Sequence, residues 1–577
     1  MVLDMSEMKI HGGEAVVESL VDHKVKTVYG LPGTHILDIY DHLRDERGIR
    51  HVLVMHEANA SFMADAHGRL TGNPGVCLVT AGPGATNALT GIAQAYTEAS
   101  PVVQITGHSG TRQKIQPDHG VDDWDFLLKI YQPVTKWSSR VERVEDICPM
   151  LSKAFAIATS DRPGPVHLEI PKYILEASGN CSDSGLDSKT EPRDISHSVE
   201  RVAEILKSAS SPMIAVGKGV LREFCSDQVI RLAKILGAPI ITLPSSIGAI
   251  PYECPLYLGY DLGEYGARWM VHPMIKSVVK KADAILTLGF DVGERLRLFG
   301  EKSGVIIHVH ARDVSIWNQE KPISGKPRIN VEAGIEHFVK SLKKKIGHKN
   351  VNVKTIENKI SQIKEKIHDD ISKSIVRGNH PIHPGEIGLE LRRILDDDAI
   401  VTIDIGNSSE WMKVCYRARK SNTILTPGRF GSMGFSLPAA IAAKINFPSR
   451  QVVAVMGDGG FLMSHMEFAT IVKYKLGIIV VVESDRRYGM IWHIQRSRFR
   501  RRTFATEIET PDFAQYATAF GATGIEVENP DELKKGLEEA VSEKGPVLVA
   551  INTEYKFPSY IPTKFARSLR KIKYLGV

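Results

Sequence analysis

The chain has few cysteines and no long apolar run. Its six cysteines are scattered over 577 residues, and none form a C-x-x-C pair, so the sequence predicts neither a zinc site nor a disulfide framework. No apolar run approaches the roughly 18 residues of a membrane-spanning helix. The opening residues MVLDMSEMKIHGGE carry acids where a signal peptide needs basic and then apolar residues. We therefore expect a soluble, cytoplasmic protein without membrane contact.

An excess of one charge is also lacking. Lys and Arg total 73 against 67 Asp and Glu, a net charge of +6, which gives no reason to expect a nucleic-acid partner. Apolar residues make up 43% and charged residues 24% of the chain, an ordinary globular balance. At about 100–200 residues per domain, the length predicts three or four domains.

Short apolar runs alternate with helical patterns in three stretches. The first contains the strand-like runs KTVYGLPG, HVLVMHE, GVCLVTAGPG, PVVQITGH and GPVHLEIP, with helical patterns such as HGGEAVVESLVDH between them. The second contains PMIAVGKGV, APIITLP, ADAILTLGF and GVIIHVH, and the third AIVTIDIG, QVVAVMGDGG, GIIVVVES and GPVLVAINTE. This repeated βαβ pattern predicts an α/β protein with three doubly wound parallel-sheet domains.

Composition sets the expected boundaries of these domains. We predict a first domain over 1–178, a Ser/Asp/Gly-rich linker over 179–196 and a central domain over 197–342. Residues 343–382 have apolar residues at helical spacing but many charges, which predicts a solvated connecting helix. The third domain and a C-terminal tail then occupy 383–577.

Two apolar runs of the third domain each end at an aspartate. Gly457-Asp458-Gly459-Gly460 follows QVVAVM and precedes the helix-like FLMSHMEFATIVKYK, and Asp485 ends the next run. In parallel sheets ligands bind outside the carboxyl ends of the strands, where glycines let backbone N–H groups approach phosphate. A carboxylate alone would repel phosphate, but Mg²⁺ bridges the two. We predict a Mg²⁺–diphosphate site; the alternative is an ordinary turn and a helix cap.

Four motifs in sequence order resemble thiamin-diphosphate enzymes, in particular the large subunit of acetolactate synthase in the acetolactate synthase and pyruvate oxidase group. They are HEANASFMADAHGRLTGNPGVCLVTAGPGATNALTGIAQAYTEASPVVQITG, DRPGPVHLEIP, TPGRFGSMGFSLPAAIAAK and GDGG with its following strand. The resemblance implies that the three domains are pyrimidine-binding, central and diphosphate-binding, and that the cofactors are thiamin diphosphate and Mg²⁺.

The resemblance also implies residue roles. Glu57 would hydrogen-bond the aminopyrimidine ring, so that the 4′-imino group can deprotonate thiazolium C2. His119 would donate a proton in the reaction, or it would be an ordinary residue of a surface loop. Asp458, Asp485 and the carbonyl of Arg487 would bind the metal. The remaining cofactor contacts would come from Pro32, Gly33, Pro83, Asn87, Gly406, Asn407, Ser408, Gly431, Met433, Gly457, Gly459, Gly460 and Tyr488.

The reaction implied is that of acetolactate synthase, two pyruvates to 2-acetolactate and CO₂, in branched-chain amino acid biosynthesis. The chain departs from that group in three places. Asp122-Asp123-Trp124 replaces a Phe-Gln-Glu stretch, Ile494 replaces a tryptophan, and GFDVGERLR replaces an Arg-Phe-Asp-Asp-Arg-like run. The last change leaves open whether the central domain binds FAD, ADP or nothing.

An arginine-rich segment keeps other reactions open. Seven arginines lie between positions 486 and 502. A solvated helix face or a subunit contact is the favoured explanation, and the alternative is the binding of an anionic substrate such as an acyl-CoA. The alternatives to the synthase are a 2-hydroxyacyl-CoA or benzoin-type lyase, a 2-oxoacid decarboxylase, and a non-catalytic cofactor-binding homologue.

Assembly follows from the same resemblance. The domain with the glutamate of one subunit would face the diphosphate domain of another, which implies a homodimer or a homotetramer with its sites at the subunit interface. The sequence leaves open whether a regulatory subunit is needed.

Overall fold

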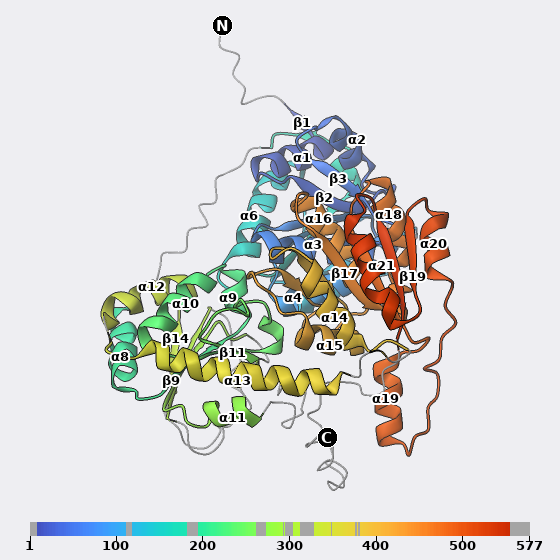
Figure 1. The fold of residues 1–577 in the computed structure, drawn as a ribbon. Helices are drawn as coiled ribbons and strands as arrows, with labels where there is room; N and C mark the ends of the chain where they lie inside the picture. Colours follow the sequence, from blue (N-terminus) through green and yellow to red (C-terminus); the bar gives the residue numbers. More distant parts are fainter. Residues whose placement is uncertain are drawn as a thin grey trace.

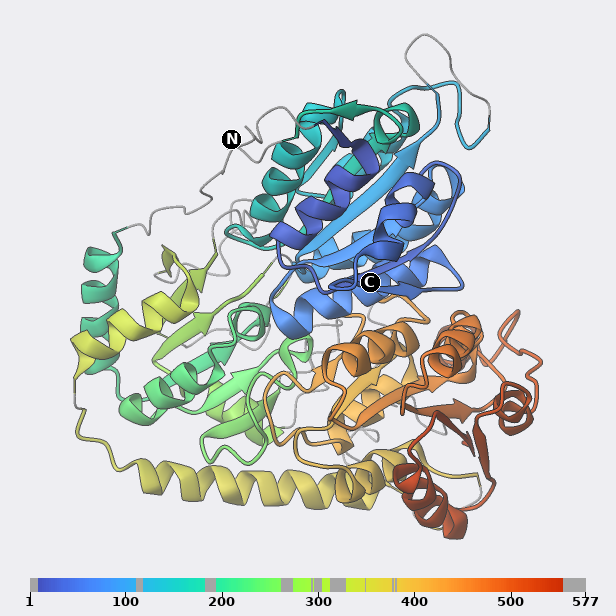
Figure 2. The ribbon, with the colours of Figure 1, turned by 90° about the horizontal axis from the view of Figure 1, so that it is seen from above.

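The computed structural model describes residues 9–110, 118–181, 194–260, 273–291, 294, 304–311, 328–347, 349–375, 378 and 381–553. They form three α/β units, here called the first, central and third units, which appear as three lobes in Figures 1 and 2. Each unit is built on a six-stranded parallel sheet, so the predicted fold class is confirmed. Most of the predicted linker and the C-terminal tail lie outside the described residues.

The first unit has the strand order β3-β2-β4-β5-β7-β6. Its strands are β2 (Thr27–Leu31), β3 (Arg50–Leu53), β4 (Gly75–Val79), β5 (Val102–His108), β6 (Trp137–Arg140) and β7 (Pro165–Pro171). Its helices are α1 (Gly12–Asp22), α2 (Leu37–Asp45), α3 (Glu57–Thr71), α4 (Pro83–Glu98), α5 (Phe126–Tyr131), α6 (Ile147–Thr159) and α7 (Lys172–Leu175). A short antiparallel pair, β1 (Ile10–His11) with β8 (Ser178–Gly179), joins its two ends.

The central unit has the order β11-β10-β9-β12-β13-β14, which is the order of dinucleotide-binding folds. Its strands are β9 (Pro212–Val216), β10 (Ile240–Thr242), β11 (Tyr257–Tyr260), β12 (Ala284–Leu288), β13 (Val305–His310) and β14 (Arg328–Glu332). Its helices are α8 (Ser196–Ser208), α9 (Lys218–Arg222), α10 (Ser226–Leu236), α11 (Pro273–Val279) and α12 (Ile335–Ile346).

The third unit repeats the topology of the first, with the order β16-β15-β17-β18-β20-β19. Its strands are β15 (Ile400–Ile403), β16 (Ile424–Leu425), β17 (Val452–Gly457), β18 (Ile479–Ser484), β19 (Thr523–Val527) and β20 (Val547–Asn552). Its helices are α14 (Pro384–Ile394), α15 (Asn407–Cys415), α16 (Ser436–Asn446), α17 (Asp458–Phe461), α18 (Phe468–Lys473), α19 (Gly489–Arg498), α20 (Phe513–Ala519) and α21 (Pro530–Ser542).

The connecting segment contains the long helix α13 (Val353–Ser374). Figure 2 shows it running from the central unit to the third unit. Ile360 and Ile363 pack into the core of the central unit, and Ile371 packs beside Trp411 of the third. Its apolar stripe therefore fastens two units, while the charges that dominate its sequence lie on its other faces.

The first and third units share one hydrophobic core. Residues of both sheets and of α3 and α16 belong to it, and the rings of Phe62 and Phe435 meet edge to face at 5.8 Å. This contact fixes the two units against each other, because separating them would expose a continuous apolar surface to water.

The structure corrects two expectations. The run FLMSHMEFATIVKYK does not form one helix: it is divided among α17, the 3₁₀ turn His465–Glu467 and α18. The break turns the buried Glu467 toward the first unit, where its carboxylate accepts hydrogen bonds from the Met55 and His56 N–H groups. In addition, Cys148 and Cys181 form a disulfide across 33 positions, although their spacing did not predict one.

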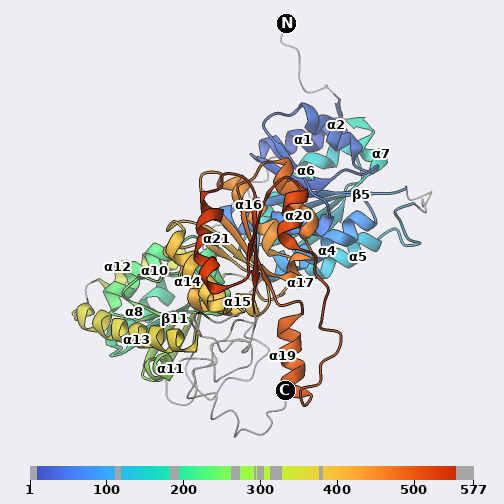
Figure 3. The ribbon, with the colours of Figure 1, turned by 45° about the vertical axis from the view of Figure 1, so that its right-hand side comes forward.

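Two further observations concern the surface. None of the helices in the described part of the chain combines the length and apolar character needed to cross a membrane. Helix α19 projects away from the body of the third unit in both Figure 1 and Figure 3, and it contains no buried residue.

Candidate functional site

A cavity lies at the carboxyl edge of the third sheet. The strand order sets β15 between β16 and β17, so the connections after β15 and β17 leave toward opposite faces and open a crevice between them. The cavity has a volume of about 230 Å³. Its lining residues, between 405 and 491, come from the loops after β15, β16, β17 and β18 and from the start of α19.

Asp458 and Asp485 stand at the ends of neighbouring strands in this cavity. Asp458 is 1% exposed; its Oδ2 accepts hydrogen bonds from the Arg486 N–H at 2.6 Å and the Asp485 N–H at 3.2 Å, and its Oδ1 accepts from the Gly459 N–H at 2.7 Å. Backbone N–H groups next to both aspartates therefore point at the single carboxylate of Asp458. Asp485 itself lines the cavity beside it.

Both aspartates have raised pKa values. Burial raises the pKa of Asp458, and burial together with the charge of Asp458 raises the pKa of Asp485 to about 7. Two carboxyl groups that resist ionisation at one place are stabilised by a divalent cation, which compensates both charges. Among the described residues no group of three or more His, Cys, Asp and Glu could hold a metal, so a cation here needs further ligands from backbone, diphosphate or water.

The glycines beside Asp458 have packing reasons. A Cβ on Gly459 would lie 2.7 Å from Cε1 of Tyr488, and a Cβ on Gly460 would lie 2.3 Å from Oδ2 of Asp404. Gly406 has φ 138°, a conformation that favours glycine. Asn407 is 4% exposed, and neither Nδ2 nor Oδ1 of its side-chain amide has a hydrogen-bond partner within the described residues. An unpaired amide and a glycine-lined wall fit a diphosphate ligand.

The structure brings every third-unit residue predicted for the site to this one cavity. Its lining includes Gly406, Asn407, Ser408, Gly431, Met433, Gly457, Asp458, Gly459, Gly460, Asp485, Arg487 and Tyr488. These residues come from four segments of the sequence, and their cofactor and metal roles stay predictions.

Glu57 lies in a second location, at the start of α3 in the first unit. It is 9% exposed, and its Oε2 accepts a hydrogen bond from Nδ2 of Asn87 at 3.0 Å. A Cβ on Gly84 would lie 3.6 Å from Oε1 of Glu57, so the N-terminus of α4, with Pro83, faces the glutamate. Residues distant in sequence therefore lie together around Glu57 at the carboxyl edge of the first sheet.

Other predicted residues of the first unit lie in the loops after β2 and before α5. Gly33, which follows Pro32 after β2, packs on Thr80: a Cβ there would lie 2.4 Å from Cβ of Thr80. His119 is exposed, has φ 60°, and places its ring 4.9 Å from the ring of His35. Its backbone carbonyl packs on Gly82, the residue before Pro83. His119 lines a small cavity together with His108 and Trp124, and the described residues that line this cavity do not include Glu57.

Sequence reasoning missed two buried acids. Asp404, directly after β15, is fully buried and accepts backbone hydrogen bonds from Gly434 at 2.8 Å and Phe435 at 3.3 Å; burial raises its pKa to about 7. It holds the loop that carries Met433, and its signal in the sequence was an aspartate directly after the apolar run that ends at Ile403. Glu467 had no comparable signal, because its partners lie more than 400 positions away in the first unit.

The arginine-rich segment begins at the cavity. Arg487 lines the cavity, and the guanidinium carbons of Arg487 and Arg496 lie 4.7 and 4.4 Å from the ring centre of Trp492. Ile494 of the same helix is exposed. The start of α19 therefore forms part of the site, and the rest of it extends into solvent.

Comparisons with known proteins agree with this geometry. Three models of thiamine pyrophosphate enzymes match: the N-terminal TPP binding domain at residues 10–125, the central domain at 199–340 and the C-terminal TPP binding domain at 404–551. The chain is 33% identical to acetolactate synthase isozyme 3 large subunit of Escherichia coli, over 92% of each chain. It is 31% identical to acetolactate synthase of Bacillus subtilis, over 95% of this chain and 94% of the relative. It is 30% identical to a probable acetolactate synthase large subunit of Methanocaldococcus jannaschii, over 94% and 91%.

Proposed function

The chain belongs to the family of thiamine pyrophosphate enzymes, and we propose that it is a thiamin-diphosphate- and Mg²⁺-dependent carboligase that converts two pyruvates to 2-acetolactate and CO₂. The observation that carries the proposal is the cavity in which Asp458 and Asp485 meet the glycine wall. Similarity to acetolactate synthases over nearly the whole chain supports the choice of reaction. The proposal includes a cytoplasmic location in branched-chain amino acid biosynthesis.

Residues of the third unit would hold the cofactor. Asp458, Asp485 and the carbonyl of Arg487 would bind Mg²⁺, and the glycine N–H groups with Asn407 would bind the diphosphate. When bound, thiamin diphosphate supplies the carbon nucleophile for the 2-oxo group. Tyr488 and Met433 both approach Gly459, and these two side chains would pack against the thiazolium ring of the bound cofactor.

Glu57 would act on the pyrimidine side of the cofactor. Nδ2 of Asn87 donates a hydrogen bond to Oε2 of Glu57 at 3.0 Å, and Oε1 faces Gly84. Retention of Glu57, Asp458 and Asp485 argues against a non-catalytic homologue.

A second copy of the chain would complete the site. The residues that line the third-unit cavity lie between 405 and 491. Glu57 and its contacts with Asn87 and Gly84 belong to the first unit. We therefore propose a homodimer, or a homotetramer of such dimers, in which Glu57 of one copy meets the diphosphate site of the other. Several relatives are named large subunits, which supports testing for a regulatory subunit as well.

The experiment is an assay of the purified protein with pyruvate, Mg²⁺ and thiamin diphosphate. Formation of 2-acetolactate, lost on removal of Mg²⁺ with a chelator, is the expected result. Cofactor binding without acetolactate, together with cleavage of a 2-hydroxyacyl-CoA, would replace the synthase by a lyase.

The arginines between 487 and 502, on α19 and on both sides of it, favour this lyase as the second candidate. Arg487 and Arg496 flank Trp492 beside the cavity, and exposed arginines follow at 498 and 500–502. Such a surface could bind the phosphates of an acyl-CoA. A benzoin-type lyase or a 2-oxoacid decarboxylase has no comparable support in the structure.

A further inference from the structure

The central sheet has the strand order in which a dinucleotide binds between the first and fourth strands. Here these are β9 and β12, and glycines follow both: Gly217 after β9 and Gly289 after β12. If the central unit held FAD or ADP, its diphosphate would lie at these turns and take their N–H groups.

The N–H groups of this turn already have partners within the protein. Gly217 donates to the Leu288 carbonyl at 2.9 Å, and Gly219 donates to the Gly289 carbonyl at 2.8 Å. The two turns are in direct contact, since a Cβ on Gly219 would lie 2.6 Å from Cα of Gly289. The glycines therefore serve the packing of the turns against each other.

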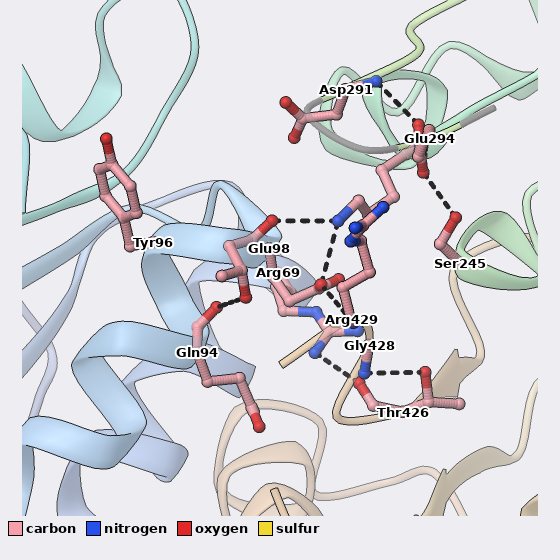
Figure 4. Close-up of polar contacts among 12 residues, drawn as sticks. Arg69, Gln94, Tyr96, Glu98, Ser245, Asp291, Glu294, Thr426, Gly428 and Arg429 are labelled. Atoms are coloured by element: carbon pink, nitrogen blue, oxygen red, sulfur yellow. Dashed lines mark hydrogen bonds and ion pairs between the residues drawn. The ribbon is translucent and has the colours of Figure 1, made fainter. Parts of the chain in front are cut away.

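A buried carboxylate faces the remaining N–H group of this turn, that of Lys218. The Lys218 N–H faces both carboxylate oxygens of Glu294 at 3.4 Å. The same carboxylate accepts hydrogen bonds from the Asp291 N–H at 2.8 Å and from Oγ of Ser245 at 2.5 Å, as Figure 4 shows. Glu294 is fully buried. Glu294 thus takes the donors that a phosphate group would use, whereas the carboxylate of Asp291 is already paired with Arg162 and Arg222.

We propose that Glu294 is a built-in anion that closes the nucleotide site, so that the central unit binds neither FAD nor ADP. The test is the absorption spectrum of the purified protein, followed by chromatography of the nucleotides released on denaturation. Titration calorimetry with FAD and with ADP complements it. No flavin bands, no released nucleotide and no saturable binding up to about 100 μM are expected. Stoichiometric flavin or ADP would overturn the proposal.

A different contact at the same junction connects all three units. Nζ of Lys218 lies 3.0 Å from Oε1 of Glu98, at the end of α4 in the first unit, and both side chains are at most 3% exposed. The same Oε1 accepts a hydrogen bond from the N–H of Arg429 in the third unit at 3.0 Å. Figure 4 shows Glu98 facing the loop with Gly428 and Arg429.

The loop is fitted closely to this carboxylate. Gly428 has φ 62°, and a Cβ there would lie 2.1 Å from the carboxyl carbon of Glu98. Burial by itself would raise the pKa of Glu98, but Lys218 and Arg69 outweigh it and the pKa is lowered. Arg69 also donates to the Thr426 carbonyl at 2.8 Å. An ionised, buried acceptor therefore holds the start of the loop.

The same loop continues into the proposed cofactor site. Gly431 and Met433 follow Arg429 by two and four positions and line the cavity. Resting on the thiamin-diphosphate part of the proposed function, we infer that Glu98 is a positioning residue for the cofactor, acting through the Arg429 N–H, with Lys218 as its counter-ion.

Two matched double variants test the role of Glu98. Glu98→Gln with Lys218→Met removes both charges but keeps an oxygen for the Arg429 N–H, whereas Glu98→Leu with Lys218→Met removes both charges and the oxygen. Calorimetry with thiamin diphosphate at saturating Mg²⁺ gives Kd, and thermal unfolding gives Tm. We expect the Leu variant to bind about tenfold more weakly than the Gln variant, which corresponds to one hydrogen bond.

The outcomes separate this inference from the proposed function. A loss of Tm with equal Kd values in the two variants would show a structural role and overturn the inference. If the Leu variant does not fold, Glu98→Asn with Lys218→Met replaces it, since the shorter amide withdraws the oxygen from Arg429. Absence of thiamin diphosphate binding by the unmodified protein would refute the proposed function itself.

Discussion

Replacing Asp485 by asparagine tests whether the two aspartates form a metal site. Without a cation, burial and the neighbouring Asp458 raise the pKa of Asp485 to about 7. Mg²⁺ binds the ionised carboxylate, so a proton must leave before the cation binds. The asparagine side chain keeps a ligating oxygen and carries no such proton.

The expected pH dependence follows from this pKa. A carboxyl group with a pKa of about 7 is about nine-tenths protonated at pH 6 and about one-tenth protonated at pH 8. Because the pKa is raised, Mg²⁺ affinity falls as the pH falls through 7. The contribution of Asp485 should change that affinity about tenfold between pH 8 and pH 6, or about 1.4 kcal/mol. Asparagine should remove this contribution.

The assay is titration of Mg²⁺ at saturating thiamin diphosphate, at pH 6, 7 and 8. Protonation of the diphosphate affects both proteins equally and cancels in their ratio. Asp512→Asn, at the exposed N-terminal cap of α20, is the matched control and should keep the unmodified slope. Equal pH slopes in the unmodified protein and in Asp485→Asn would refute the reasoning.

Three further predictions concern the cofactor site. Glu57→Gln should lower kcat about 10²–10⁴-fold and leave the Kd of thiamin diphosphate within about twofold, because it removes a proton and little volume; steady-state kinetics with full activity would exclude the assigned role. Gly459→Ala should weaken cofactor binding about tenfold with little change in Tm, because the new Cβ would meet the Tyr488 ring at 2.7 Å; unchanged Kd by calorimetry would contradict the packing. Mixing Glu57→Gln subunits with Asp458→Ala subunits should restore up to about a quarter of the activity, since mixed dimers hold one intact site; no recovery after refolding together would argue for sites within single chains.

The sheets were predictable because their signal is local. A buried parallel strand must be apolar along its whole length, so runs such as VVAVMG stand out between polar segments, and each ends where its chain leaves the sheet. The placement of Asp458 and Asp485 at one edge followed directly, since parallel strands present their carboxyl ends together. The domain limits at 178, 196, 342 and 382 stay predictions.

Breaks inside an apolar pattern were harder to predict. FLMSHMEFATIVKYK has the spacing of a helix, yet the chain is interrupted near Ser464, because the Glu467 carboxylate bonds the N–H groups of Met55 and His56. The disulfide of Cys148 with Cys181 was equally hidden, since nothing in a pair of isolated cysteines indicates their distance in the fold.

The amino-acid order was enough to specify three parallel sheets, a glycine-rich turn with two aspartates at one sheet edge, and the family. These features are encoded in contiguous stretches, where hydrophobic period and glycine position act over a few residues. The junction of Glu98, Lys218 and Arg429 was not readable in this way. Its members come from three units and meet only when all are packed, and a hydrogen bond between distant positions leaves no period in the chain. Each segment that lines the cavity is thus recognisable within a short stretch of sequence, whereas the contacts that support the cavity depend on the packing of all three units.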